Sequence, residues 1–485
     1  MGIRTGAQVL DGLRDGRQLY MNGERIADVT RDPRFAGGAR TVAELYDLQH
    51  DPKRIDEMTY RSPTTGDRVG LSFLEAKTRD DLARRRVMYK HWHDHTLGMF
   101  GRAPDFLNAM LSAWASGQQA FGQYGGNMRA YYERVRENDL ITTHSLTNPQ
   151  VDRSKNVAAQ AKDLAAKVVK ETDSGIVVHG ARMLATFGAY SDELIVMPAP
   201  SFPLPENTDD ALPYATGFAV PMATEGLRFI CRPTTMHRDG SAMDHPLASR
   251  FDESDCMVVF DNVKVPWERV FIHRDVGIFN SIYARTGAVL AGAHQFVTKD
   301  LAKSEFMMGL AFALVKTTNI DGFQHIQGGL AELINQTETV RACLVASEAT
   351  AALSPHGAMI PGPWPLEVIR LGYGQMFRRA CEIIQIMGAG GLFMVPSYAE
   401  LDGALSEDVA RYYQAANADS RARIKLFRLA YDAALSSFSG RQQLYERYFA
   451  GDPVRSAGGL YHRYDTKPYA ERIWQTLDRF EKDGR

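Results

Sequence analysis

The sequence predicts an α+β fold in which an N-terminal helical domain, a middle antiparallel β-barrel and a C-terminal helical bundle follow one another. Three observations support this order. Apolar residues recur at helical spacing over most of residues 1–139, short β-rich runs bounded by turn-forming residues fill residues 140–275, and helical periodicity returns over residues 276–485. A chain of 485 residues is long enough for two or three domains.

The N-terminal region is expected to be mainly helical. Residues 76–99 are rich in Leu, Ala, Arg and Lys, and residues 105–137 carry apolar side chains at three-to-four spacing. Before them, the apolar run 19–21 precedes Asn22-Gly23, a dipeptide typical of tight hairpin turns. We therefore expect a short β-hairpin over residues 17–29 and helices after it.

The middle region contains short strands separated by Gly, Pro, Asn and Asp, a spacing typical of an antiparallel barrel or sandwich. One helix is expected to interrupt them at residues 154–170. The insert 198–213 contains five prolines and is expected to form a loop; long loops inside compact domains are often functional. The predicted strands cover residues 174–180, 193–197, 215–221, 226–232 and 256–266.

The C-terminal region is expected to form a bundle, because residues 298–317, 324–351 and 364–387 are long enough to pair as helices. A stop and turn are predicted at residues 354–357, Ser-Pro-His-Gly. Helical, β and helical regions in this order are typical of the acyl-CoA dehydrogenase architecture. That similarity concerns the fold and not the reaction.

The composition argues against several functional classes. The net charge is −2, with 56 basic and 58 acidic residues, so neither nucleic acid nor an anionic membrane is expected as the main partner. The longest apolar runs, such as residues 287–293, are far shorter than the ~20 residues of a membrane span. The N-terminus has no apolar core of the kind a signal peptide needs, so we expect a cytoplasmic protein.

No metal site or disulfide framework is predicted. His91 and His95 lie one helical turn apart and His93 lies between them, but no glutamate separates them as in H-E-x-x-H. The cysteines are scattered and form no C-x-x-C pair, which argues against disulfides and against an all-cysteine site. They are Cys231, Cys256, Cys343 and Cys381.

Two segments bring together side chains suited to an anionic or phenolic ligand. Residues 101–106 read Gly-Arg-Ala-Pro-Asp-Phe, and residues 143–153 read Thr-His-Ser-Leu-Thr-Asn-Pro-Gln-Val-Asp-Arg. An arginine such as Arg102 offers a rigid fork of donors, and a neutral histidine such as His144 can donate from one ring nitrogen and accept at the other. Taken singly, a surface arginine at a helix start and a satisfied histidine on a strand explain them as well.

Nucleotide-binding motifs are absent, with one weaker exception. No G-x-G-x-x-G follows a strand and no G-x-x-x-x-G-K-[ST] occurs, so an oxidoreductase of this kind would receive its electrons from elsewhere. Residues 385–391 read Gln-Ile-Met-Gly-Ala-Gly-Gly at the end of an apolar helix, where Gln385 and Gly388 could approach a nucleotide closely. They resemble the Gln-x-x-Gly-Gly element by which acyl-CoA dehydrogenases contact the FAD of a neighbouring subunit. An ordinary glycine helix cap explains them equally well.

Nearly the whole chain resembles the oxygenase component of the 4-hydroxyphenylacetate 3-hydroxylase family. The matching elements are residues 5–13, 101–106, 144–153, 180–186, 227–232, 260–267, 440–447 and 451–455. The resemblance implies an acyl-CoA dehydrogenase-like fold, a homotetramer, and ortho-hydroxylation of a phenol to a catechol. Reduced FAD would come from a separate NAD(P)H-flavin reductase, and O2 would be the co-substrate.

The resemblance also implies roles for individual residues. Arg102 and His144 would contact the phenol, together with the positions of Phe106, Ala199 and Pro200. His144 or His294 would accept the phenol's proton while Arg102 stabilises the phenolate, and the insert 198–213 would exclude water. The residues expected to bind FAD are His144, Ser145, Leu146, Gln150, Val151, Asp152, Arg153, Thr186, Gln385, Gly388, Gly451 and Asp452.

Two departures from the family pattern concern the substrate. Phe106 stands where the family has a phenol-contacting tyrosine, and Ala199-Pro200 stands where it has a hydroxyl-bearing pair. A site without those donors should not bind 4-hydroxyphenylacetate in the usual way. We expect a larger or more apolar phenol, such as a tyrosine derivative or a biosynthetic intermediate, either free or tethered to a carrier.

Three alternatives remain open at this point. An acyl-CoA dehydrogenase would need a carboxylate base, for which Glu382 or Glu400 could be nominated. A 4-hydroxybutyryl-CoA dehydratase would need cysteine ligands for an iron–sulfur cluster near Arg102 and Phe106 and at position 301, which is a leucine here. A flavoprotein scaffold without catalytic activity is the third.

Overall fold

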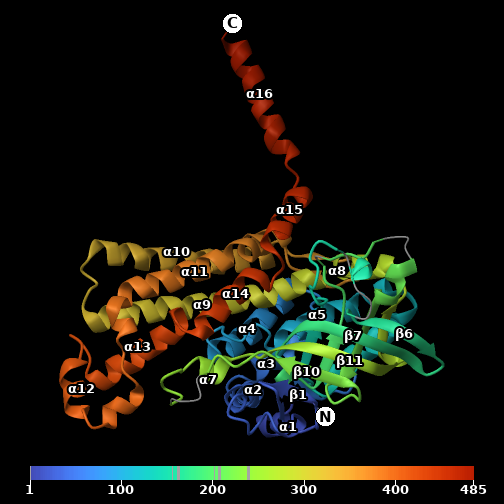
Figure 1. Cartoon of the computed structure of the whole chain (residues 1–485). Coiled ribbons are helices and arrows are strands. Elements are labelled where there is room, and N and C mark those ends of the chain that lie inside the picture. Colours follow the sequence, from blue (N-terminus) through green and yellow to red (C-terminus); the bar gives the residue numbers. More distant parts are fainter. Residues whose placement is uncertain are drawn as a thin grey trace.

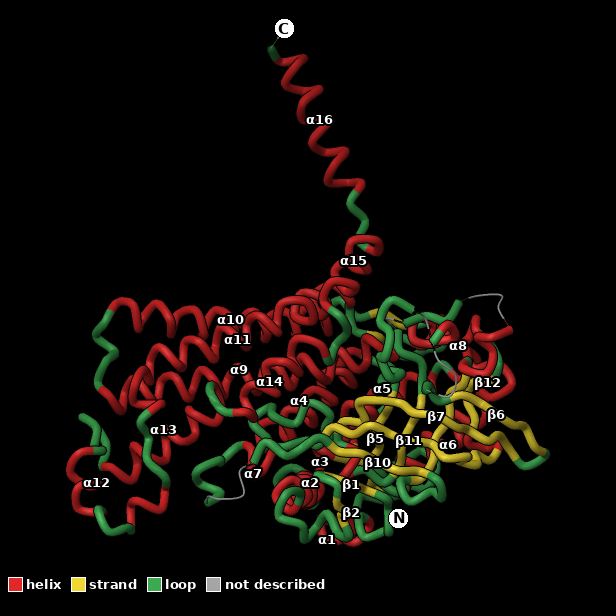
Figure 2. Tube along the Cα trace, viewed as in Figure 1, coloured by secondary structure: helices red, strands yellow, loops and turns green. Residues whose placement is uncertain are grey.

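The computed structural model describes residues 2–155, 157–160, 164–200, 202–205, 209–236 and 241–484, and it confirms the predicted α+β class. The sheets and the N-terminal helices lie together in one half of the molecule, and the long C-terminal helices extend from them (Figure 1). The last helix projects away from the body with the C-terminus at its tip (Figure 2).

The predicted N-terminal helices over residues 76–99 and 105–137 are confirmed, the second divided by a 3-10 segment. Thr78 and Asp81 form a capping box that satisfies the first N–H groups of one helix, and Pro104 lies in the first turn of the next, where its missing N–H costs nothing. The helices are α1 (Gly6–Gly12), α2 (Ala36–Leu48), α3 (Ile55–Met58), α4 (Arg79–His95), α5 (Pro104–Ser116), η2 (Gln118–Tyr124) and α6 (Gly125–Glu137).

The predicted hairpin is confirmed as β1 (Leu19–Met21) and β2 (Glu24–Ile26), which pair antiparallel. Asn22 and Gly23 have φ angles of 55° and 80°, as a tight hairpin turn requires. β1 also pairs in parallel with β10 (Leu227–Cys231), so this hairpin extends a sheet of the middle region.

The middle strands form two sheets in place of the single antiparallel barrel that we expected. The larger sheet has the order β2-β1-β10-β11-β7-β6 and the smaller β12-β9-β8-β5, and within the described residues neither closes on itself. The β1–β10 and β5–β8 pairs are parallel. The local pattern of residues 140–275 could not reveal this, because the N-terminal hairpin occupies the place beside β10. The other strands are β5 (Thr142–Ser145), β6 (Lys167–Thr172), β7 (Gly175–Thr186), β8 (Glu193–Val196), β9 (Thr216–Pro221), β11 (Asp255–Pro266), β12 (Val270–His273) and the short hairpins β3 (Thr59–Arg61) with β4 (Arg68–Gly70) and β13 (Ala352–Leu353) with β14 (Met359–Ile360).

The helix expected at residues 154–170 is wrong where the structure describes it. Only the short 3-10 segment η3 (Val157–Ala159) is helical, and β6 begins at Lys167; residues 156 and 161–163 lie outside the described residues. β6 pairs antiparallel with β7, and this pairing overrides the helix propensity of an alanine-rich segment. The insert 198–213 contains residues without regular secondary structure and the 3-10 segment η5 (Asp209–Tyr214), and its residues 201 and 206–208 also lie outside the described part.

The C-terminal bundle is confirmed, and the predicted turn at residues 354–357 lies between β13 and β14. A glycine-rich interruption occurs in its third long helix, where Ala389 has a φ of 41°. Within the described residues, no helix combines the length and the apolar character needed to cross a membrane. The middle region contains α7 (Ala248–Phe251), and the helices of the C-terminal region are α8 (Val276–Thr286), α9 (Ala288–Thr318), α10 (Gln324–Ala349), α11 (Pro363–Phe393), α12 (Ser406–Tyr412), α13 (Ser420–Ala434), α14 (Ser437–Tyr448), α15 (Pro453–Arg463) and α16 (Lys467–Asp483).

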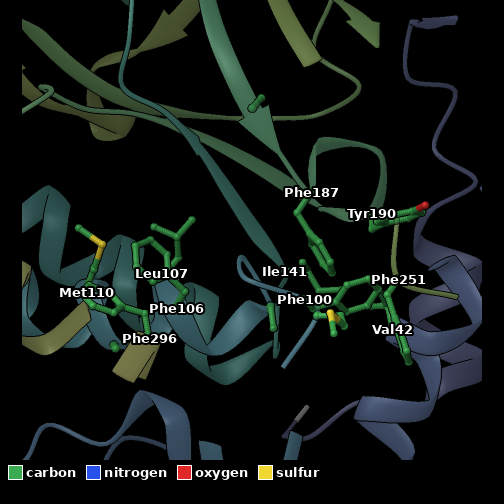
Figure 3. Packing of buried hydrophobic residues seen from close by; sticks show 14 of the residues in the cluster. Val42, Phe100, Phe106, Leu107, Met110, Ile141, Phe187, Tyr190, Phe251 and Phe296 are labelled. Carbon is green, nitrogen blue, oxygen red and sulfur yellow. The ribbon is translucent and has the colours of Figure 1, made fainter. Parts of the chain in front are cut away.

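Aromatic packing fixes the loop between α4 and α5 against the sheets. The ring of Phe100 meets those of Phe187 and Phe251 edge-on, at centroid distances of 5.2 and 5.7 Å, and the three lie together in Figure 3. Each buried phenylalanine contributes roughly 1.5–3 kcal/mol. The loop that follows Phe100 is therefore held in one position.

Substituting Gly180 by alanine should destabilise the larger sheet. Gly180 has a φ of 115°, and a Cβ there would lie 2.4 Å from the carbonyl oxygen of Ala165. We expect Gly180→Ala to lower the free energy of unfolding by about 2 kcal/mol, measured by calorimetry and denaturant titration. The control is Gly309→Ala in α9, where a Cβ meets nothing within 4 Å, and which should gain about 0.5–1 kcal/mol. Equal effects of the two substitutions would contradict the prediction.

Candidate functional site

Three parts of the chain hold Arg102. Its backbone N–H donates to Oε1 of Glu253 at 2.7 Å, and its Nη2 donates to the carbonyl oxygen of Phe449 at 3.0 Å. Its guanidinium carbon lies 4.0 Å from the ring centroid of Phe106, a cation–π contact. The guanidinium is thus fixed against an aromatic face.

His144 lies against the ring of Phe106. Its ring is 5.7 Å from that of Phe106 with an interplanar angle of 30°, so Arg102, Phe106 and His144 are brought together as the sequence predicts. Burial, and secondly the charge of Arg102, hold the pKa of His144 well below 6.5. The imidazole is therefore neutral, with one nitrogen able to accept a proton.

The segment expected to bind FAD runs beside the end of β7. Ser145 Oγ donates to the carbonyl oxygen of Met183 at 3.0 Å, and Thr143 Oγ1 donates to that of Thr186 at 2.6 Å. The Met183 N–H donates to the carbonyl oxygen of Thr147. Ser145, Leu146 and Thr186 are thus placed in one locality, close to His144.

A β-bulge in β7 reshapes this locality. Cys256 pairs with Ala185 and Val258 with Arg182, so β7 carries one residue more than β11 between these pairs. Leu184 adopts a φ of 66° and is 53% exposed. The bulge therefore turns an apolar side chain outward next to Thr186, which the alternation of residue types in the sequence does not indicate.

An ion network connects Thr186 to Arg102. Thr186 Oγ1 donates to Asp255 at 2.7 Å, and Arg441 of α14 binds both Asp255 at 2.8 Å and Glu253 at 2.5 Å. Burial alone would raise the pKa of Asp255, but Arg441 and Arg232 hold it well below its usual range. Sequence reasoning missed Glu253 and Asp255, although Arg441 lies in the matching element 440–447.

His294 is not brought together with Arg102 and His144. Its Nε2 lies 2.8 Å from Glu348 Oε1 of α10, and its ring packs edge-on against Tyr89 of α4. Burial lowers its pKa, against the opposing effect of Glu348. The part of α9 that faces Phe106 is Gly292, where an added Cβ would lie 3.4 Å from the Phe106 ring. These contacts support a structural role for His294 rather than that of the base.

The start of the insert 198–213 is attached to α8. Tyr283 of α8 donates its hydroxyl to the carbonyl oxygen of Pro198 at 2.9 Å, beside Ala199 and Pro200. Burial raises the pKa of Tyr283, and the charge of Arg102 opposes that rise. Further along, Leu204 and Asn280 exchange two hydrogen bonds that tie the insert to α8.

The remaining expected FAD-binding residues lie in three places. Gln150, Val151, Asp152 and Arg153 form an exposed or partly exposed segment after β5. Gly451 and Asp452 follow Phe449, whose carbonyl oxygen binds Arg102, and Asp452 caps α15. Gln385 and Gly388 lie in α11, where Gln385 donates to the carbonyl oxygen of Ala434; no described contact joins them to Arg102.

The three neighbouring histidines of α4 have separate partners. His91 contacts Glu57 at 2.6 Å, His93 contacts Asp105 at 2.9 Å, and His95 contacts Glu44 at 2.9 Å. No group of three potential metal ligands occurs among the described residues.

The neutral state of His144 should make stability depend on pH. The unfolded chain takes up a proton at His144 near pH 6.5, whereas the folded protein resists protonation. The contribution of His144 to the free energy of unfolding is therefore fully present above pH 6.5 and is lost as the pH falls. Below that pH, wild-type protein should lose up to ~1.4 kcal/mol per pH unit more than His144→Gln. Unfolding titrations across this range measure the difference, with the exposed His462→Gln as control. Parallel curves for wild type and His144→Gln would contradict the prediction.

Comparisons with known proteins agree with this geometry. The chain matches the family profile described as 4-hydroxyphenylacetate 3-hydroxylase N terminal over residues 5–272 and the C-terminal profile over residues 279–478. The oxygenase component of 4-hydroxyphenylacetate 3-monooxygenase from Thermus thermophilus is 43% identical over 97% of this chain and 96% of its own. The oxygenase component of 4-nitrophenol 2-monooxygenase from a Rhodococcus species is 31% identical over 92% of this chain and 86% of its own.

Solved structures support the same relationship. The oxygenase component of a 4-hydroxyphenylacetate 3-monooxygenase, complexed with FAD and 4-hydroxyphenylacetate, has a TM-score of 0.94 at 42% identity and covers 99% of this chain and 100% of its own. An archaeal 4-hydroxybutyryl-CoA dehydratase (TM-score 0.87, 19% identity) and a butyryl-CoA dehydrogenase (0.51, 13%) share the fold alone, which confirms the predicted architecture. Since the two profiles cover most of its length, the chain belongs to the 4-hydroxyphenylacetate 3-hydroxylase family.

Proposed function

We propose that this protein is the oxygenase component of a two-component flavin monooxygenase that ortho-hydroxylates a phenol to a catechol, with reduced FAD delivered by a separate NAD(P)H-flavin reductase. The observation that carries the proposal is the group formed by half-buried Arg102 with buried Phe106 and neutral His144. FAD-dependent phenol monooxygenase is the activity that its family membership and its relatives establish.

The described residues fit a flavin. Ser145 of β5 and Thr186 of β7 lie on neighbouring segments, which the hydrogen bond from Thr143 to the carbonyl oxygen of Thr186 joins, and Leu184 of β7 presents an exposed apolar side chain. Bound reduced FAD activates O2 and supplies the oxygen atom that enters the ring. The protein has to hold the phenol, move its proton and exclude water.

Arg102 and His144 have different roles toward the phenol. The guanidinium stabilises the phenolate oxygen, and the neutral imidazole accepts the phenol's proton. Loss of that proton raises the electron density at the ring carbon next to the oxygen, where the new hydroxyl is to be placed. The contacts of His294 do not favour it as the base.

Water exclusion is assigned to the insert 198–213. Its described residues are fixed at two points on α8, by Tyr283 at Pro198 and by Asn280 at Leu204. A covered site strengthens the electrostatic effect of Arg102 and limits the loss of oxygen as hydrogen peroxide.

For the substrate we propose a larger or more apolar phenol than 4-hydroxyphenylacetate. Phe106 provides no hydroxyl to the site, and Ala199 and Pro200 provide no polar side chain. The family includes a relative named for 4-nitrophenol, a phenol without a carboxylate. A tyrosine derivative or a biosynthetic intermediate, free or carrier-tethered, fits these features.

We further propose a cytoplasmic homotetramer in which Gln385 and Gly388 contact the FAD of a neighbouring subunit, while Gln150–Arg153, Gly451 and Asp452 contact FAD bound to their own. The projecting helix α16 supports assembly, because it carries exposed Ile473, Trp474 and Leu477 (Figure 1). We propose three domains, which comprise residues 1–139, 140–275 and 276–485.

Labelled oxygen tests the proposed reaction. Purified protein, reduced FAD, 18O2 and a panel of phenols should yield catechols that contain one 18O atom, detected by mass spectrometry. Absence of label from every product would refute the monooxygenase assignment, and reduction of bound FAD by an acyl-CoA would point to a dehydrogenase.

Arg102→Ala should uncouple the reaction. Without the guanidinium the phenolate is not stabilised, so catechol formed per FAD oxidised should fall at least about tenfold while hydrogen peroxide rises. Product chromatography and a peroxidase assay measure both. Arg31→Ala, at an exposed position, is the control; unchanged coupling in Arg102→Ala would remove this residue from the site.

Phe106→Tyr should move specificity toward 4-hydroxyphenylacetate. The added hydroxyl restores a donor beside Arg102, and a site that hydrogen-bonds its substrate can gain about tenfold or more in kcat/KM. Steady-state kinetics with 4-hydroxyphenylacetate and 4-nitrophenol measure the change. Phe312→Tyr, on the surface, should leave both values unchanged; a variant at position 106 that behaves like this control would contradict the prediction.

A further inference from the structure

Arg182 is a buried cation whose charge has no anionic partner among the described residues. Its side chain is 1% exposed, its Nη1 donates to the carbonyl oxygen of Leu146 at 3.0 Å, and its Nε is buried without a partner. Burial lowers the pKa of Arg182 to about 10, and Tyr283 is the one ionisable neighbour that opposes this. An unpaired buried charge is unfavourable, so a ligand that offsets it would bind strongly.

The β-bulge places Arg182 at the site. Arg182 pairs with Val258 at the start of the bulge and points inward, whereas Leu184 points outward. Its hydrogen bond to Leu146 attaches it to the segment assigned to the flavin. Burial raises the pKa of Tyr283, and the charges of Arg102 and Arg182 both oppose that rise.

Donors outnumber acceptors around Tyr283. The Tyr283 hydroxyl donates to Pro198, and Trp114, whose ring lies 5.9 Å from that of Tyr283, has a buried Nε1 without a partner. Among the described residues, Arg182 and Trp114 thus each hold a buried N–H group without an acceptor, which favours a ligand that carries negative charge.

We propose that Arg182 binds a negatively charged group of a ligand in the active site. The two sources of such a group are the anionic ring system of reduced FAD and an acidic group on the phenol. The contact with Leu146 favours the flavin. This inference rests on the proposed function, because the flavin and the phenol are the ligands of that function. It assigns a role to Arg182, for which the family resemblance implies none.

Binding experiments without turnover test the inference. Arg182→Met removes the charge at similar length, Arg182→Lys keeps it, and Arg228→Met alters an exposed arginine of the same sheet as control. If the anion is reduced FAD, Arg182→Met should weaken anaerobic binding of reduced FAD about tenfold or more and affect oxidised FAD much less. Arg182→Lys should retain most of the affinity.

A second pair of probes identifies the other source. If the anion belongs to the substrate, Arg182→Met should bind reduced FAD normally but lose affinity for 4-hydroxyphenylacetate relative to its neutral amide. Either selective loss supports the inference. Unchanged binding of all four probes, or an equal loss for charged and neutral forms in a folded variant, overturns it.

The wild-type protein provides a readout that does not depend on a variant folding. The absorbance of bound reduced FAD, followed from mildly acidic to neutral pH, should show the anionic form at a lower pH than for free FAD, or the acid should bind more tightly than the amide. If the wild-type protein shows neither of these two behaviours, the inference is overturned. Failure of wild-type protein to bind reduced FAD at all would instead refute the proposed function.

Discussion

The ion network of Arg441 with Glu253 and Asp255 is the interaction on which the site depends. Glu253 positions the backbone of Arg102, and Asp255 receives the hydroxyl of Thr186, so one arginine of α14 ties the loop before α5 to the end of β7. Because these groups are largely buried, removal of one partner would leave an uncompensated charge. The proposed phenol and flavin sites are thereby held in a fixed relation.

A surplus of positive charge is the second property of the site. Arg102 and Arg182 have no carboxylate in ion-pair contact among the described residues, and Arg102 helps to keep His144 neutral. This bias favours a phenolate over a phenol and an anionic ligand over a neutral one. Before the reaction, neutral His144 adds no second positive charge beside Arg102. During the reaction it can accept a proton.

Much of this could be predicted from sequence, and the failures have identifiable causes. Arg102 and His144 were predicted to lie together because both belong to family motifs with distinctive residue types, and the structure brings both against Phe106. The hairpin at Asn22-Gly23 followed from local turn chemistry. The helix expected at residues 154–170 was wrong because β6 pairs with β7, and the barrel was wrong because the hairpin at the N-terminus joins β10. Both depend on partners distant in sequence.

The sequence alone determined the class of fold, the order of its three regions, the family, and the pairing of an arginine with a histidine, because periodicity, turn residues and motif spacing are local properties. Tertiary structure alone decided which side chains share a compartment. It placed Phe106 between Arg102 and His144, directed His294 to Glu348, and left Arg182 buried without a counter-charge. Burial and charge neighbours are set by the packing of distant segments, and the reactivity of each group follows from them.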